Sequence, residues 1–232
     1  MNYKLMQMSQ QYPVNEIFAT LQGEANFTGT PSIFIRLQGC DVGCSWCDTK
    51  HTWDVRQANQ INLVTLLTKT HDKSSWANAS IKQITEFIQT NFPQIKHVVI
   101  TGGEPAIYDL RPLCLALEEL GKDIQIETSG TRDLRVSDNT WVTLSPKIDM
   151  PGGRIILNEC ISRANEIKMP IGKMADIQKL KSFLANNLVP KNIPIWLQPL
   201  SQSKTATKLC VRQSLLNNWQ LSLQTHKFIN IR

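Results

Sequence analysis

Six short runs of apolar and β-branched residues recur along the chain, and segments with helical spacing separate them. Each run has six or seven residues, which is a usual strand length and too short for a buried helix. Most are apolar at consecutive positions, as in strands buried on both faces between helix layers. The runs span residues 32–37, 96–101, 123–128, 140–145, 165–170 and 194–200. This alternation predicts an α/β fold with a mostly parallel sheet, and six such strands can curl into a partial (βα) barrel.

The intervening segments carry recognisable helix boundaries. One helix is predicted to begin at Ser80, which forms a capping box with Gln83, and to end before Pro93. A second helix has leucines at helical spacing over 110–120, and Gly121 ends it. Similar spacing occurs over residues 177–184 and 209–216.

The bulk properties favour one soluble domain, which we assign to residues 1–232. No apolar run approaches the roughly 20 residues that span a membrane, and the N-terminus lacks the apolar centre of a signal peptide. The net charge of +6 is scattered, so it indicates an ordinary solvated surface or attraction of a small anionic substrate. There is no basic stripe with interleaved aromatic residues of the kind that binds nucleic acid. We therefore expect a cytoplasmic protein without membrane or nucleic-acid partners.

Three of the six cysteines lie within eight residues of one another. Cys40, Cys44 and Cys47 have the spacing C-x3-C-x2-C, which allows one loop to direct three thiolates toward one centre. Disulfide pairing would leave one of them over, so the pattern indicates a metal site in an intracellular protein. The other three occupy apolar positions of helical segments, where we expect core residues: Cys114, Cys160 and Cys210.

Two kinds of metal centre fit this loop. Three thiolates can hold a [4Fe-4S] cluster and leave one iron without a protein ligand, and a catalytic metal needs such an open position. Alternatively, His51 follows Cys47 by four residues and could close a tetrahedral Cys3His zinc site. The loop by itself favours the cluster and leaves zinc as the rival.

The residues that follow the predicted strands also point to a site, because ligands of parallel sheets bind beyond the carboxyl ends of the strands. The cysteine loop follows the first run, and Gly102-Gly103-Glu104-Pro105 follows the second. Glycines there let the backbone approach a ligand closely. Further segments follow the later strands at 128–130, 145–147 and 198–201. We expect the carboxyl ends of these five strands to converge on one binding site.

Together, the cysteine spacing and "TGGEP" resemble the radical S-adenosylmethionine superfamily. Flanking segments such as "NEIFATLQGE", "WCDTKHTW", "IETSGT", "LQPLSQ" and "QTHKFINI" are similar to the 7-carboxy-7-deazaguanine synthase family. This resemblance covers nearly the whole chain and disfavours zinc. The chain departs from the family at Ala25, where glycine is frequent, and residues 55–79 carry no assignment from it.

The resemblance implies that the three cysteines are catalytic and hold a [4Fe-4S] cluster. It also implies a structural or cofactor-positioning role for Glu104. S-adenosylmethionine would bind at the open iron, and its one-electron cleavage would give a 5′-deoxyadenosyl radical. Residues that match the cofactor-binding positions of the family are Trp46, Cys47, Asp48, Gly103, Ser145, Pro146, Lys147 and Gln198. Residues that match its substrate positions are Leu21, Gln22, Gly23, Arg36, Thr101 and His226. Thr49 is the position that the family suggests for Mg²⁺.

Arg36 and His226 also have ordinary structural interpretations. A guanidinium at the end of a buried strand must be paired, either with substrate or with a carboxylate such as Glu24. Without the resemblance, His226 near the C-terminus would be assigned to the surface or to the edge of a strand.

The reaction that the resemblance implies converts 6-carboxy-5,6,7,8-tetrahydropterin to 7-carboxy-7-deazaguanine, with ring contraction and loss of ammonia. This is a carbon–nitrogen lyase step in the formation of queuosine precursors. An electron donor such as flavodoxin and a homodimer are also implied. Two alternatives remain: a glycyl-radical-enzyme activase, which would need a protein-docking surface, and a zinc-stabilised binding module, which would need no cofactor.

Overall fold

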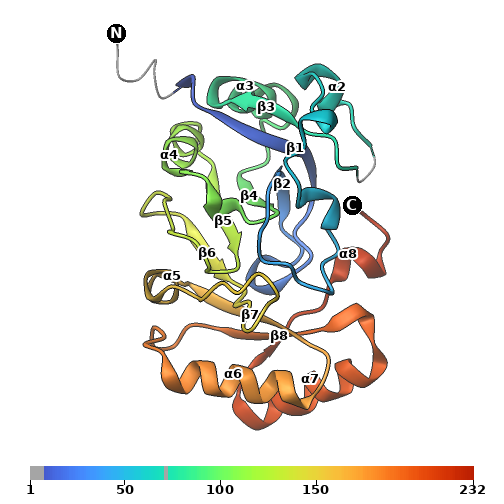
Figure 1. The fold of residues 1–232 in the computed structure, drawn as a ribbon, viewed down its shortest axis with the longest axis vertical. Helices are drawn as coiled ribbons and strands as arrows, with labels where there is room; N and C mark the ends of the chain where they lie inside the picture. The colour runs from blue at the N-terminus through green and yellow to red at the C-terminus, as the bar shows by residue number, and fades with distance from the viewer. Residues whose placement is uncertain (1–7, 71–72) are drawn as a thin grey trace.

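The structure is a computed structural model that describes residues 8–70 and 73–232, and nine strands form one sheet within these residues (Figure 1). The strands are β1 (Gln11–Leu21), β2 (Pro31–Leu37), β3 (Ala77–Ser80), β4 (His97–Gly102), β5 (Asp123–Thr128), β6 (Trp141–Leu144), β7 (Glu166–Ile171), β8 (Ile195–Pro199) and β9 (Gln220–Leu221). Their order across the sheet is β3-β1-β2-β4-β5-β6-β7-β8-β9. Neighbours from β2 to β9 are parallel, while β1 is antiparallel to β2 and β3.

The predicted α/β fold with a mostly parallel, partial-barrel sheet is confirmed. The six predicted strands are β2, β4, β5, β6, β7 and β8, and each predicted end lies within one residue of the observed end. The sequence does not predict β1, because its run contains Pro13 and the buried polar residues Asn15 and Glu16, and a bulge between Val14 and Glu16 interrupts its alternation.

The principal helices lie on the outer side of the sheet (Figure 1). They are α3 (Ile81–Asn91), α4 (Arg111–Glu119), α5 (Asn158–Arg163), α6 (Met174–Asn186) and α7 (Lys204–Asn217), with shorter α2 (Leu63–Leu67) and α8 (Thr225–Phe228). The capping box is confirmed, because Ser80 Oγ accepts from Gln83 N (3.2 Å) and Gln83 Oε1 accepts from Ser80 N (2.9 Å). Gly121 has a φ of 69° just beyond α4, as its predicted stop requires.

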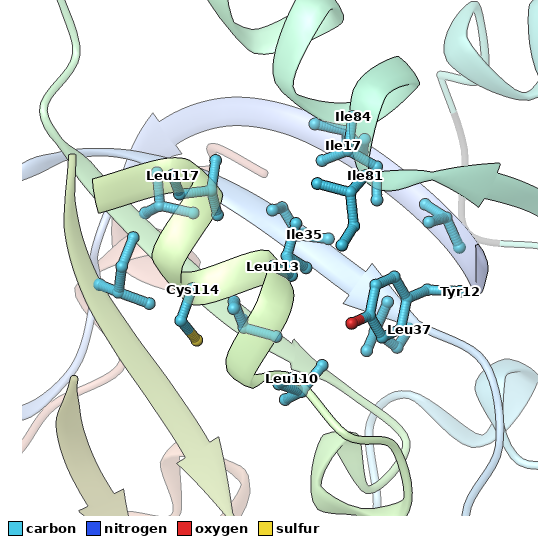
Figure 2. Packing of buried hydrophobic residues seen from close by; sticks show 14 of the residues in the cluster. Tyr12, Ile17, Ile35, Leu37, Ile81, Ile84, Leu110, Leu113, Cys114 and Leu117 are labelled. Carbon is cyan, nitrogen blue, oxygen red and sulfur yellow. The ribbon is translucent and has the colours of Figure 1, made fainter. Parts of the chain in front are cut away.

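Apolar side chains hold these helices against the outer face of the sheet. Leu113, Cys114 and Leu117 of α4 pack in one cluster with Ile35 and Leu37 of β2 (Figure 2). A second cluster lies between α6, α7 and the strands β7 and β8. Burying each large side chain stabilises the fold by about 1.5–3 kcal/mol. The three cysteines expected in the core are fully buried: Cys114, Cys160 and Cys210.

The inner face of the same strands is polar, so the expectation of strands apolar on both faces is wrong. Gln125, Thr143 and Glu166 are each 0% exposed inside the barrel. Gln125 Nε2 donates to Thr143 Oγ1 (2.8 Å), and Thr143 Oγ1 donates to Glu166 Oε1 (2.6 Å). No helix layer is needed on this side, because the buried polar groups satisfy one another.

The loop between β1 and β2 enters the barrel and completes this polar chain. Gln22 Nε2 donates to Gln125 Oε1 (3.1 Å), and Asn26 N donates to Glu166 Oε2 (3.3 Å). The loop therefore links the inner sides of β5 and β7 and acts as an internal plug.

Ala25 lies in this plug with a φ of 54°, in the left-handed region that favours glycine. Its side chain is buried, and its backbone N donates to Ser222 Oγ (2.9 Å). The departure from the glycine that is frequent in the family thus leaves a locally strained backbone, which costs about 1–2 kcal/mol relative to glycine at the same conformation.

No helix within residues 8–70 and 73–232 is long and apolar enough to cross a membrane. The sequence expectation about a signal peptide rests partly on residues 1–7, which lie outside the described residues.

Candidate active site

The carboxyl ends of β2, β4, β5, β6 and β8 open on one cavity of about 370 Å³, as their sequences predict. All but one of the predicted site residues line it: Leu21, Gln22, Gly23, Arg36, Cys40, Cys44, Trp46, Cys47, Asp48, Thr49, Thr101, Gly103, Ser145, Lys147, Gln198 and His226. Pro146 is the exception among the described residues, and it follows Ser145 without reaching the cavity. The structure therefore brings nearly the whole predicted set together in one place.

The cysteine loop follows β2 and is held by backbone hydrogen bonds. Cys40 N donates to Trp53 O (3.0 Å), and Cys47 N donates to Cys44 O (3.1 Å). These bonds fold the loop so that all three cysteines line the cavity.

The segment between β6 and α5 supports the loop from outside. Gly152 N donates to Val42 O (3.1 Å), and Arg154 forms an ion pair with Asp41 (2.5 Å). Arg132 forms a second ion pair with the same oxygen of Asp41. Two cations on one carboxylate fix the position of the loop beside Cys40.

Three cysteines of one loop are a donor set that fits a [4Fe-4S] cluster. Burial raises the pKa of Cys40 to about 11, and burial also raises the pKa of Cys44, where Lys147 opposes the shift. In the described part of the chain, no three His, Cys, Asp or Glu side chains lie close enough to hold one metal ion. A [4Fe-4S] cluster binds each thiolate to a different iron and needs wider spacing. His51 does not line the cavity, so nothing in the described residues supports the Cys3His zinc site.

Gly102 and Gly103 each leave room for another segment of backbone that approaches closely. A Cβ on Gly102 would lie 2.2 Å from Leu37 O, and one on Gly103 would lie 2.1 Å from Gly39 O. The close approach is therefore between the loops that follow β2 and β4. Gly103 still lines the cavity.

Glu104 has the structural role that was one of its two predicted roles. It is 2% exposed, and it accepts hydrogen bonds from Thr128 Oγ1 (2.6 Å), Ser129 N (2.8 Å) and Ala106 N (3.1 Å). This carboxylate ties the end of β4 to the end of β5.

A buried charge cluster forms another part of the wall, and sequence reasoning missed it. Lys168 Nζ lies 2.5 Å from Glu24 Oε2 and also forms an ion pair with Glu127. Burial would raise the pKa of Glu24, but Lys168 outweighs it and lowers that pKa to about 2. Burial raises the pKa of Glu127, and Lys168 opposes the shift. The sequence gives only a weak signal, since Glu127 and Lys168 are charged residues next to Ile126 and Ile167 in short strands.

Arg36 is paired, but its partner is not Glu24. Its Nε lies 2.6 Å from Glu16 Oε1, and Arg232 also forms an ion pair with Glu16. Glu16 is 1% exposed, so it needs these cations. Arg36 also lines the cavity, with 16% of its side chain exposed.

His226 lies in the cavity wall rather than on the open surface. A Cβ on Gly23 would lie 2.1 Å from His226 Nδ1, so glycine makes room for the ring. Thr225 N donates to Gly23 O (2.9 Å), and Lys227 Nζ lies 3.0 Å from Asp48 Oδ2. The C-terminal helix α8 thus joins the plug to the cysteine loop.

Three further predicted groups contact other residues that line the cavity. Lys147 Nζ donates to Ser145 O (3.0 Å), and burial lowers the pKa of Lys147 while Cys44 opposes the shift. Thr49 Oγ1 lies 3.5 Å from Cys47 Sγ. Gln198, predicted at the cofactor, donates from Nε2 to Glu24 Oε1 (3.2 Å) and so lies beside the charge cluster.

The barrel and the three-cysteine loop define the class of protein. Residues 34–148 match the Radical SAM superfamily, which places both the cysteine loop and the "TGGEP" segment inside the matched region.

Comparisons over the full length narrow the class further. The chain is 51% identical to 7-carboxy-7-deazaguanine synthase of Escherichia coli (strain K12), over 95% of this chain and 99% of that protein. It is 45% identical to the synthase of Buchnera aphidicola subsp. Schizaphis graminum over the same shares. The crystal structure of QueE from Escherichia coli superposes with a TM-score of 0.91 at 48% identity, covering 96% of this chain and 98% of that one. The chain therefore belongs to the 7-carboxy-7-deazaguanine synthase family.

Proposed function

We propose that this protein converts 6-carboxy-5,6,7,8-tetrahydropterin to 7-carboxy-7-deazaguanine with loss of ammonia, as a radical S-adenosylmethionine lyase in queuosine precursor synthesis. The observation that carries the proposal is one cavity that unites the three-cysteine loop with a charged, hydrogen-bonding wall. The identity of 51% to a 7-carboxy-7-deazaguanine synthase over almost the full chain supports it.

Cys40, Cys44 and Cys47 would hold a [4Fe-4S] cluster. With S-adenosylmethionine bound, such a cluster supplies the one-electron chemistry that starts hydrogen abstraction from the substrate. Around it, Trp46 and Asp48 of the loop border the cofactor, and the Lys227 ion pair holds Asp48 in place. The chain's own contribution is to orient the reactants and exclude water from a narrow cavity.

The substrate is a flat heterocycle with one carboxylate and a hydrogen-bonding edge. Arg36 offers a planar cation for the carboxylate, and its pair with buried Glu16 keeps the guanidinium fixed in the wall. Gln22 and the Glu24–Lys168–Glu127 cluster offer polar atoms for the edge. Gly23 and His226 complete this side of the cavity.

Mg²⁺ is part of the proposal, with Thr49 as its protein ligand and with oxygens of substrate and water completing the shell. The Thr49→Val variant is nearly isosteric and lacks the hydroxyl. We expect it to need several-fold more Mg²⁺ for half-maximal activity while keeping the visible spectrum of the cluster. A magnesium titration identical to that of the parent would remove Thr49 from the site.

The same proposal takes residues 1–232 as one domain of a cytoplasmic homodimer that receives electrons from a donor such as flavodoxin. Size-exclusion chromatography with light scattering tests the dimer. Reduction of the cluster by purified flavodoxin tests the donor.

The deciding experiment is anaerobic reconstitution followed by incubation with S-adenosylmethionine, a reductant and the pterin. We expect about four irons and four sulfides per chain and formation of 7-carboxy-7-deazaguanine, identified by its mass. Zinc without sulfide would favour the binding module. Iron and sulfide without product, together with radical formation on an added protein, would favour the activase.

A further inference from the structure

Lys168 is the buried cation of the Glu24–Lys168–Glu127 cluster, and neither the sequence nor the proposed reaction gives it a task separate from that of the two carboxylates. Its side chain is 5% exposed, although it belongs to the cavity wall. Glu24 and Glu127 flank it, and each of their side chains is 16% exposed. The ammonium group therefore lies behind the two carboxylates, which remain open to the cavity.

The carboxylate oxygens that Lys168 does not contact have unequal surroundings. Glu24 Oε1 accepts from Gln224 Nε2 (2.8 Å) and Gln198 Nε2 (3.2 Å). Glu127 Oε1 has a long contact of 3.5 Å with Gln22 Nε2. Glu127 Oε1 therefore keeps the larger unused capacity to accept hydrogen bonds from a ligand.

The charges around Lys168 come from several elements of the barrel. The carboxylates are Glu24 on the plug, Glu127 on β5 and Glu166 on β7, and the second cation is Lys147 beyond β6. His226 of α8 lies close enough to affect Glu24. With His226 neutral, the three carboxylates and two lysines have one negative charge in excess. Removing Lys168 would leave three carboxylates against one lysine, and at least one of them would then take up a proton.

We propose that Lys168 is a positioning residue that keeps Glu24 and Glu127 ionised and side by side, so that this wall accepts N–H donors and selects an amino-pyrimidine edge over one bearing carbonyl oxygens. A carboxylate only accepts hydrogen bonds, whereas a protonated carboxyl also donates one. The charge on Lys168 thus decides which edge of a flat ligand fits. This inference rests on the proposed function and adds a determinant of its specificity.

The test uses the anaerobically reconstituted enzyme with S-adenosylmethionine and measures binding of 6-carboxypterin between pH 5 and 9. In Lys168→Met we expect affinity at pH 7 to fall about ten- to a hundredfold, and the midpoint of the pH dependence to move upward by about one to three pH units. Affinity should recover at high pH, where the carboxyls ionise again. The parent should bind 6-carboxypterin more tightly than the 2-oxo analogue 6-carboxylumazine. Lys168→Met should bind the two ligands with similar affinity.

Two variants separate charge from shape. Lys168→Arg keeps the cation and should restore the midpoint of the parent, even if its affinity is lower. Lys179→Met removes an exposed lysine that pairs with Asp149 on the surface, and it should leave both the midpoint and the affinity unchanged.

If Lys168→Met does not fold, the double variant Glu127→Gln/Lys168→Met removes one charge of each sign. That variant should fold and should discriminate poorly between the two ligands.

An unchanged midpoint and unchanged discrimination in Lys168→Met, or in the double variant, would overturn the inference. The inference would also be overturned if Lys168→Arg and Lys168→Met lost affinity equally and differed from the parent otherwise only by lower melting temperatures. Product formation by the parent separates this inference from the proposed function. A parent that forms no 7-carboxy-7-deazaguanine contradicts the function, whereas an active parent with indifferent Lys168 variants contradicts only the role of Lys168.

Discussion

On strand β5, Ile124 and Ile126 belong to the apolar cluster under the outer helices, whereas Gln125 and Glu127 face the interior of the barrel. The same division continues on β7, where Ile167 and Met169 pack outward and Lys168 lies in the cavity wall. Adjacent residues of one strand therefore belong to two different environments.

Stability and chemistry therefore depend on opposite faces of one sheet. The outer face gains stability from apolar area removed from water, and similar apolar residues can replace one another there. The inner face consists of polar groups that must each find a specific partner, because an unpaired buried charge is costly. Substitutions on the two faces should therefore have separable consequences.

The largest contrast is expected among the six cysteines. Cys40→Ala, Cys44→Ala or Cys47→Ala should abolish cluster assembly, because two thiolates cannot hold it. The outer-face variants should retain full iron content and lose only stability, by about 1–2 kcal/mol, because a buried thiol is removed: Cys114→Ala, Cys160→Ala and Cys210→Ala. Iron analysis and thermal melts of the six variants check this. Loss of iron in Cys114→Ala with retention in Cys44→Ala would reverse the assignment of the site.

The next effect concerns Arg36 on the inner face. Arg36→Lys keeps the charge but loses the planar fork, so substrate affinity should weaken by about 1.5–3 kcal/mol, or roughly ten- to a hundredfold. Stability should change little, because Arg232 remains paired with buried Glu16. A substrate titration beside a thermal melt decides the matter. Unchanged affinity with a lowered melting temperature would make Arg36 purely structural.

A smaller effect is expected from His97, a buried inner-face residue. Ser32 Oγ donates to Thr30 O (2.8 Å), so His97 Nδ1 is the donor in its 2.8 Å bond to Ser32 Oγ. His97 Nε2 is buried and has no hydrogen-bond partner among the described residues, so a proton there would be unpaired. Burial lowers the pKa of His97 from 6.5 to about 4, while Asp123 opposes the shift.

Because the pKa of His97 is lower in the folded state than in the unfolded state, its contribution to stability is present above pH 6.5 and is lost as the pH falls toward 4. By pH 5 the loss should reach about 2 kcal/mol. The His97→Gln variant should lose about 2 kcal/mol less than the parent between pH 7 and pH 5 in urea unfolding. Parallel losses in the two proteins would show that His97 does not control this part of the pH dependence.

The smallest effect tests the strain in the plug. Ala25→Gly removes the strain of a left-handed alanine, which stabilises the folded state by about 1–2 kcal/mol. Glycine also makes the unfolded chain more flexible, which lowers the free energy of unfolding by about 0.4–1 kcal/mol. We expect a gain of up to about 1 kcal/mol in the free energy of unfolding. Ala116→Gly, inside α4, is the matched control and should cost about 1 kcal/mol. A destabilised Ala25→Gly variant would show that the alanine methyl packs too well for the strain to matter.

Several features of the fold and site follow from short stretches of sequence. The capping box at Ser80 and the stop at Gly121 depend on residues within one helical turn, so local rules suffice. The cavity was predictable because parallel strands end at one edge, and the residues after each end are visible in the chain. Glu16 was not predictable as the partner of Arg36, since it lies on the unpredicted strand β1.

Sequence alone is enough to predict the alternation of strands and helices, the cysteine loop and the family to which the chain belongs. These properties depend on spacing between residues that are near one another in the chain, or on segments similar to those of relatives. The polar interior depends on the folding of distant segments, because Lys168 contacts Glu24, 144 residues away in the chain, and Glu127, 41 residues away. Whether a charge in a strand faces water, a helix or another charge depends on which way the sheet curves. That curvature arises from the packing of the whole chain, and no single segment encodes it.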